Sequence, residues 1–343
     1  SVLDDYQITR DVYKNVQPEP KLEVAEDIAN AVRRGNYNAV VGIGGGSVLD
    51  MAKVAAGMAT NDGAPKSYLG ANKFTNSALP LVLIPTTAGT GSEVTSRAMV
   101  TADEKAVFAD DILYAKVALV DPKLTASMPP KVTADTGFDA MCHALEGVLS
   151  KEKFYGVEKE VEEDGYEAVR IIAGNIRNAV KDGSNLQTRE YMMKGSLLAG
   201  FVLSKKAMVY GHSMGYPFAP KYNIPHGRSV IMALPYIMQF YGARDEDSKN
   251  KISRIAKDLD IGKFWQSNGI KVYETVNTIK GLIDEVYGNL NLPITLNGIG
   301  VKKEELPAMA KLCLEKWPRP ASPVQASELD IFGLYNQMWE GKM

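Results

Sequence analysis

The sequence predicts a two-domain protein, with a mixed α/β domain followed by an all-helical domain. In the first third of the 343-residue chain, short apolar runs rich in β-branched residues alternate with helix-like segments. Beyond the Pro129–Pro130 pair, apolar residues recur at helical spacing and strand-like runs disappear. We therefore expect an α/β domain over residues 1–129 and an all-α domain over residues 130–343.

The strand-like runs are apolar along their whole length. Such runs are typical of strands buried on both faces, and their alternation with helices indicates a parallel sheet covered by helices. The runs expected to form strands are 38–43 (NAVVGI), 79–84 (LPLVLI) and 116–120 (KVALV). The segments expected to form helices are 21–34 and 47–59 in the first domain, and 132–149, 161–180, 188–203 and 270–288 in the second.

Composition and charge are those of an ordinary globular protein and argue against several partners. Hydrophobic residues make up 45% of the chain, charged residues 23%, and the formal net charge is -2. This balance gives no attraction to nucleic acid or to an anionic membrane, and no segment reaches the roughly 18 apolar residues of a membrane span. The two cysteines, Cys142 and Cys313, cannot form a disulfide framework, so we expect free thiols and a cytoplasmic protein.

A glycine-rich turn follows the first strand-like run and precedes a helix. Gly44, Gly45 and Gly46 allow the backbone to approach a ligand closely, and the N–H groups at the start of the next helix favour a phosphate. Ser47 and Asp50 have the spacing of a capping box, so a well-capped turn that binds no ligand is the alternative.

A second polar loop, 85–93 (PTTAGTGSE), follows the next strand-like run directly. Ligands of open α/β sheets bind beyond the carboxyl ends of the strands, so this loop and the glycine-rich turn are expected to serve one nucleotide. The hydroxyl groups of Thr86, Thr87 and Ser92 are suited to bind ribose or phosphate oxygens. A serine- and threonine-rich turn without a ligand is the alternative.

The chain has three histidines, and their pattern suggests a metal site. Asp139 and His143 lie four residues apart in an apolar helical pattern, so a carboxylate and an imidazole share one helix face. His212 and His226 lie in a segment interrupted by prolines, which predicts a helix end and a loop. Three imidazoles and one carboxylate suit zinc, iron or another first-row ion. For each residue alone, a hydrogen-bonded histidine without a metal is the alternative.

Five motifs, in this order, resemble the iron-containing (group III) alcohol dehydrogenase family. They are GGGSVLDMAK (44–53), PTTAGTGSE (85–93), ALVDPKL (118–124), TGFDAMCHALEG (136–147) and the segment 212–227, which contains HSMG and YNIPHG. The resemblance extends to the C-terminus, where 317–341 (WPRPASPVQASELDIFGLYNQMWEG) is similar to the closing helix of the family. It implies the dehydroquinate synthase-like architecture, with a Rossmann-like N-terminal domain and a helical metal-binding domain.

The resemblance implies a role for each matched residue. Asp139, His143, His212 and His226 correspond to the four metal ligands of the family. The cofactor-binding positions implied for this chain are Gly44, Gly45, Gly46, Ser47, Asp50, Thr86, Thr87, Ser92 and Lys105. The implied reaction is hydride transfer between a primary or secondary alcohol, or a hydroxy acid, and NAD or NADP. Fe(2+), or another divalent ion such as Zn(2+), would polarise the substrate oxygen, and the implied assembly is a homodimer.

Two features depart from the family pattern. Tyr216 stands where many members carry a histidine linked to proton relay, so its hydroxyl is the candidate relay here. Tyrosine at this position is also similar to members of the hydroxyacid–oxoacid transhydrogenase type. The first strand and helix of the family's nucleotide domain, with the acidic residue that separates NAD from NADP, are expected to be missing ahead of Ser1.

Other functions stay open on the sequence alone. They are a hydroxyacid–oxoacid transhydrogenase-like enzyme, a lyase of the dehydroquinate synthase-like group, a glycerol dehydrogenase-like zinc enzyme, and a metal- or nucleotide-binding protein that has lost catalysis. The lyase needs a basic substrate pocket, whereas the segment 212–227 contains Lys221 as its single basic side chain besides histidine.

Overall fold

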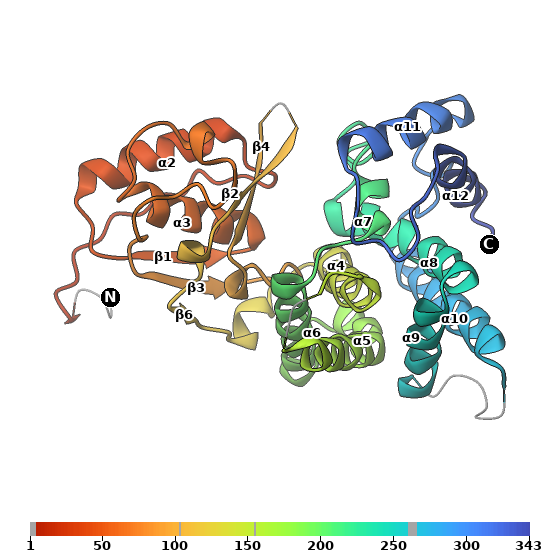
Figure 1. Ribbon diagram of the computed structural model, residues 1–343. Coiled ribbons are helices and arrows are strands. Elements are labelled where there is room, and N and C mark those ends of the chain that lie inside the picture. Colours follow the sequence, from red (N-terminus) through yellow and green to blue (C-terminus); the bar gives the residue numbers. More distant parts are fainter. Residues whose placement is uncertain (1–4, 103, 154–155, 260–265) are drawn as a thin grey trace. The chain divides into compact units, whose positions relative to one another are not determined.

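The computed structural model describes residues 5–102, 104–153, 156–259 and 266–343. The chain forms two compact units, which we describe separately (Figure 1). The first unit comprises Ser1–Pro85 and Ser96–Leu119, and the second comprises Thr86–Thr95 and Val120–Met343. The polar loop after the second predicted strand therefore belongs to the second unit, although the strand itself belongs to the first.

The first unit is an α/β structure with two small sheets. Strands β1 (Val40–Gly44), β3 (Leu81–Pro85) and β6 (Val117–Ala118) form a parallel sheet in the order β1-β3-β6. Strands β2 (Gly70–Ala71), β5 (Lys105–Ala109) and β4 (Arg97–Thr101) form the other sheet, in which β4 runs antiparallel to β5. Helices α2 (Leu22–Gly35) and α3 (Gly46–Met58) complete the unit.

Helix α3 is the centre of this unit because it is buried on almost every side. Its residues Leu49, Ala52 and Ala56 pack against Leu81 and Leu83 of β3. Its other side packs against α2, β4 and β5. Gly42 of β1 lets the strand approach the helix, since a Cβ there would lie 2.7 Å from the Cβ of Ala52.

The opposite face of the parallel sheet differs from expectation. Its side chains are apolar, as the continuous apolar runs predict, yet Val41 is 56% exposed and Ile43 is 59% exposed. Val117 and Leu119, on the neighbouring part of the same face, are about half exposed. Parallel sheets usually have both faces covered, whereas among the described residues of this unit α3 covers the face of Leu81 and Leu83.

The second unit is helical, and within its described residues it contains no strand. Its helices are α4 (Pro130–Leu149), α5 (Glu158–Lys181), α6 (Leu186–Lys205), α7 (Tyr210–Gly215), α8 (His226–Arg244), α9 (Glu246–Asp258), α10 (Asn268–Asn289), α11 (Leu306–Lys316) and α12 (Glu328–Glu340). Helices α4 and α8 are buried almost all round, so the other helices pack about them. Among the described residues, no helix is both long and apolar enough to cross a membrane.

The architecture agrees with the fold class predicted from the sequence. The helices expected at 132–149 and 270–288 are present as α4 and α10, with ends within two residues of the prediction. Pro130 suits the first position of α4, because its fixed φ is already helical and it has no N–H that would need a partner. The β4–β5 hairpin and the short helix α7 were not expected, since neither has a long apolar period in the sequence.

Candidate metal centre

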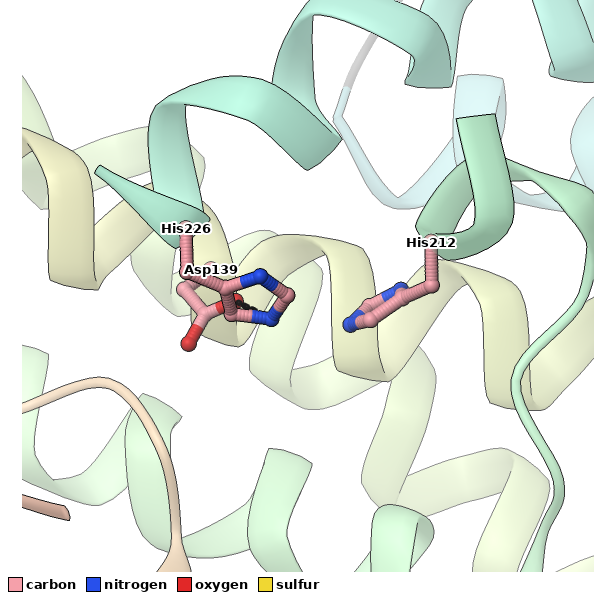
Figure 2. Close-up of side chains that lie close together, drawn as sticks. All are labelled: Asp139, His212 and His226. Carbon is pink, nitrogen blue, oxygen red and sulfur yellow. Dashed lines mark ion pairs between the residues drawn. The ribbon is translucent and has the colours of Figure 1, made fainter. Parts of the chain in front are cut away.

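Three of the four predicted metal ligands converge in the helical unit (Figure 2). Asp139 lies in the middle of α4, His212 lies on α7, and His226 is the first residue of α8. One ligand atom from each of these residues lies within 4.8 Å of the others. Nε2 of His226 lies 3.6 Å from Oδ1 of Asp139. Three helices that are separate in the sequence thus bring two imidazoles and a carboxylate to one point.

His143 lies beside this group, one helical turn after Asp139. Its Nε2 atom is 3.8 Å from Oδ1 of Asp139, and its ring stacks on that of His212 with centroids 5.1 Å apart. Burial lowers the pKa of His143 and the charge of His212 acts in the same direction, against the influence of Asp139, Glu146 and the Gly89 backbone. The neutral imidazole, which is the form that binds metals, is therefore favoured.

Buried polar atoms at this point lack hydrogen-bond partners. They are Oδ1 of Asp139, Nδ1 of His143 and Nε2 of His212. A buried polar atom without a partner costs about 1–3 kcal/mol, so a cluster of them indicates a binding partner other than protein. Imidazole nitrogens and a carboxylate oxygen are donors that iron, zinc and similar ions accept. The residues present therefore fit a divalent first-row metal ion.

Glu146 also lies at this centre, although the sequence patterns did not predict a role for it. The residue is fully buried on α4, and its Oε1 atom lies 2.7 Å from Nδ1 of His212. Its Oε2 atom accepts hydrogen bonds from the backbone N–H groups of Val209 (2.9 Å) and His212 (3.2 Å). A carboxylate that accepts the Nδ1 proton orients the ring and leaves Nε2 for a metal. The signal was a glutamate three residues after His143 with apolar residues or glycine on both sides, where a charge needs a partner.

A buried ion pair joins the two helices that carry Asp139 and His226. The Nε and Nη2 atoms of Arg228 donate to Oδ1 (3.1 Å) and Oδ2 (3.2 Å) of Asp135, one turn before Asp139. The hydroxyl of Tyr287, from α10, donates to Oδ1 of Asp135 at 2.9 Å. The helices also touch closely, since a Cβ on Gly227 would lie 1.9 Å from the backbone oxygen of Asp135. These contacts set the position of His226 relative to Asp139.

The glycine-rich turn lies in the α/β unit and differs in detail from expectation. Helix α3 begins at Gly46, with Gly45 as its N-cap and no side-chain cap, so Ser47 lies within the first turn and does not cap the helix. Gly44 to Ser47 are half-buried. Oδ2 of Asp50 accepts a hydrogen bond from the N–H of Met99 at 2.9 Å, and its Oδ1 lies 3.6 Å from Nζ of Lys53. The carboxylate of Asp50 therefore ties α3 to β4.

The polar loop after β3 packs against the helical unit through glycines. A Cβ on Gly91, which has φ of 60°, would lie 2.4 Å from Cα of Gly200 on α6, and a Cβ on Gly89 would lie 2.6 Å from Cβ of Thr136 on α4. Thr86 and Thr87 are half-buried, and Ser92 is buried at the start of a short 3-10 helix. The backbone of this loop thus packs against α6 and against α4, the helix that carries Asp139 and His143.

Two further predicted residues have partners of their own. Nζ of Lys105 forms an ion pair with Glu19 at 2.9 Å, within the α/β unit. The ring of Tyr216 stacks on that of His226 with centroids 5.9 Å apart, and the Trp317 ring meets it edge-on at 5.2 Å. Tyr216 therefore lies next to a predicted metal ligand, at the position where a relay was expected.

Comparisons with known proteins agree with this architecture. Residues 1–122 match the family model "iron-containing alcohol dehydrogenase", and residues 133–339 match the model for the C-terminal domain of the same family. The chain is 36% identical over 337 residues to long-chain-alcohol dehydrogenase 1 of Geobacillus thermodenitrificans, covering 96% of this chain and 82% of that protein. It is 31% identical over 331 residues to 1,3-propanediol dehydrogenase of Citrobacter freundii, covering 95% and 82%.

A solved structure of 1,3-propanediol oxidoreductase is similar over most of the chain. Its TM-score is 0.87 at 30% identity, and the match covers 96% of this chain and 84% of that one. As the five sequence motifs indicate, the chain belongs to the iron-containing alcohol dehydrogenase family.

Proposed function

We propose that this alcohol dehydrogenase depends on a divalent metal held by Asp139, His143, His212 and His226, and that it transfers a hydride between an alcohol and NAD or NADP. The observation that carries the proposal is the convergence of the buried Asp139 and His212 with the half-buried His226, whose ligand atoms lie within 4.8 Å of one another. Iron is the metal we favour, because the family is named for it. Zinc and other first-row ions suit the same donors.

The chemistry divides between the metal and the chain. When bound, a divalent ion acts as a Lewis acid on the substrate oxygen and favours loss of the alcohol proton. The chain's part is to hold the donors: Glu146 fixes the His212 ring through Nδ1, and the Asp139 carboxylate contributes negative charge. The hydroxyl of Tyr216, beside His226, is the candidate group for carrying the alcohol proton away. Hydride transfer itself is the chemistry of the nicotinamide.

We assign the dinucleotide to the turn of Gly44, Gly45, Gly46 and Ser47. The backbone N–H groups at the start of α3 lack a side-chain cap, and the positive end of a helix dipole favours a pyrophosphate. The hydroxyl groups of Thr86, Thr87 and Ser92 are proposed to contact the dinucleotide. Lys105 is proposed to leave its ion pair with Glu19 and to bind the ribose instead. Asp50 supports the turn from behind through its bond to β4.

The substrate is proposed to be a small alcohol or aldehyde, with hydroxy acids and oxo acids included. One similar protein is named for long-chain alcohols and another for 1,3-propanediol, so chain length varies among the relatives. We further propose a cytoplasmic homodimer. Both cysteines are buried free thiols, which suits a reducing compartment.

Replacing His226 with alanine is expected to abolish tight metal binding and to lower the NAD(P)-linked rate more than about a hundredfold. The measurements are metal content after loading with ferrous iron, and turnover of simple alcohols and hydroxy acids with either coenzyme. Arg177→Gln, which breaks an exposed ion pair with Glu285, is the control and should keep metal and rate. Full metal content in the His226 variant would refute the site, and metal and nucleotide binding without any turnover would refute the activity.

A further inference from the structure

Arg319 is held against the helix that carries a metal ligand. Its Nε atom donates to Oγ of Ser213 at 2.6 Å, and the Ser213 hydroxyl donates to the backbone oxygen of Trp317 at 2.7 Å. Ser213 follows His212 directly on α7. One end of the guanidinium is thus fixed beside the metal centre, while the side chain as a whole stays half-buried.

The guanidinium of Arg319 has no carboxylate partner among the described residues. Arg170, Arg177, Arg228 and Arg254 each pair with a carboxylate, and the ion pairs within the described part of the chain do not include Arg319. Its Nη1 and Nη2 groups make no hydrogen bond to that part of the chain either. An arginine is always charged and presents a planar fork that matches a carboxylate or similar anion. A charged guanidinium that is fixed through Nε, and that has no carboxylate partner in the described part of the chain, is therefore suited to bind a small anion.

Aromatic rings connect this guanidinium to the metal centre. Its carbon lies 5.9 Å from the centre of the Tyr216 ring, which itself stacks on His226 at 5.9 Å. The distance from the guanidinium carbon to the centre of the His226 ring is therefore at most the sum of these two distances. Trp317 packs edge-on against Tyr216 and adds an apolar surface at the same place. Tyr216, His226 and Trp317 are all half-buried, so none of them is sealed inside the core.

We propose that Arg319 binds an anionic group on the substrate, at the end remote from the reacting alcohol or aldehyde. The preferred substrates are then hydroxy acids and the corresponding aldehyde acids, with the carbon chain lying along Tyr216 and Trp317. This inference rests on the proposed function and specifies its substrate class. Arg319 determines specificity in this scheme and does not take part in hydride transfer.

Matched pairs of hydroxy acids and diols of increasing chain length test the proposal, for example 4-hydroxybutanoate against 1,4-butanediol. The wild-type ratio of kcat/KM for acid over diol should exceed one at the chain length that spans the two sites. Arg319→Gln, which keeps a donor for Ser213 but removes the charge, should lower that ratio roughly tenfold to a hundredfold. Arg319→Lys should give an intermediate ratio, because the charge stays and the fork is lost.

Direct binding provides a readout that does not depend on turnover. Calorimetry with butanoate should show binding to the wild type that weakens with added salt, and roughly tenfold weaker binding to Arg319→Gln. Arg177→Gln serves as the control, and it should match the wild type in both measurements. A wild type without preference for the acid at any chain length, or a glutamine variant that keeps the preference, would overturn the proposal. A third outcome is that the protein turns over neither substrate class but still binds butanoate through Arg319. That outcome would count against the proposed dehydrogenase activity alone.

Discussion

Replacing Arg228 with methionine is expected to lower the free energy of unfolding of the metal-free protein by about 3–5 kcal/mol. Arg228 and Asp135 are both almost completely buried, and two N–H···O bonds join them. Removing the cation leaves the Asp135 carboxylate in the core with the hydroxyl of Tyr287 as its remaining side-chain partner. A single buried charge is far more costly than the pair, because its desolvation is no longer compensated.

Urea unfolding of the metal-free protein measures this effect, and two further variants interpret it. Arg177→Met, at the exposed pair with Glu285, should change the free energy of unfolding by less than about 1 kcal/mol. The double variant Asp135→Leu with Arg228→Met removes both charges and should recover much of the lost stability. A single Arg228 variant as stable as the wild type would show that this ion pair does not hold α4 and α8 together.

Replacing Glu146 with glutamine is expected to weaken metal binding about 10-fold to 100-fold. The carboxylate accepts three N–H groups, from Val209, from the His212 backbone and from the His212 ring. A glutamine side chain has one acceptor oxygen and presents an NH2 group in place of the other. At least one of these three N–H groups then faces the NH2 group of the glutamine, with which it makes no hydrogen bond. The His212 ring also loses the carboxylate that directs Nε2 toward Asp139.

Competition with a chelator measures the metal affinity of the Glu146 variant, and unfolding of its metal-free form separates affinity from stability. Glu146→Ala should also destabilise the metal-free protein, since each buried N–H left without a partner costs about 1–3 kcal/mol. Glu285→Gln, on the exposed side of α10, is the matched control. Wild-type metal affinity in Glu146→Gln would show that His212 is oriented by packing alone.

Local spacing in the sequence was sufficient to predict part of the site. Asp139 and His143 lie on one face of α4 because residues four apart in a helix point the same way. The continuous apolar runs predicted β1 and β3, and the apolar periods predicted α4 and α10. These features depend on residues that are close in the chain. Their spacing and the geometry of a helix or strand together determine which side chains share a face.

Other parts of the site depend on contacts between distant segments, and local periodicity does not encode such contacts. His212 and His226 meet Asp139 because α7 and α8 pack on α4, and Gly227 and the Arg228–Asp135 pair set that packing. The contact of the Asp50 carboxylate with the N–H of Met99 on β4 is of the same kind, since it joins residues far apart in the chain.

The sequence by itself determined the fold class, the family and the types of donor atom at the candidate metal centre. The tertiary structure alone decided that Glu146 orients His212 and that Arg319, near Tyr216, has no carboxylate partner among the described residues. The physical reason is that a charge in a folded chain is defined by its surroundings. The same glutamate or arginine is a surface residue, a buried support or a binding group according to which distant residues pack around it.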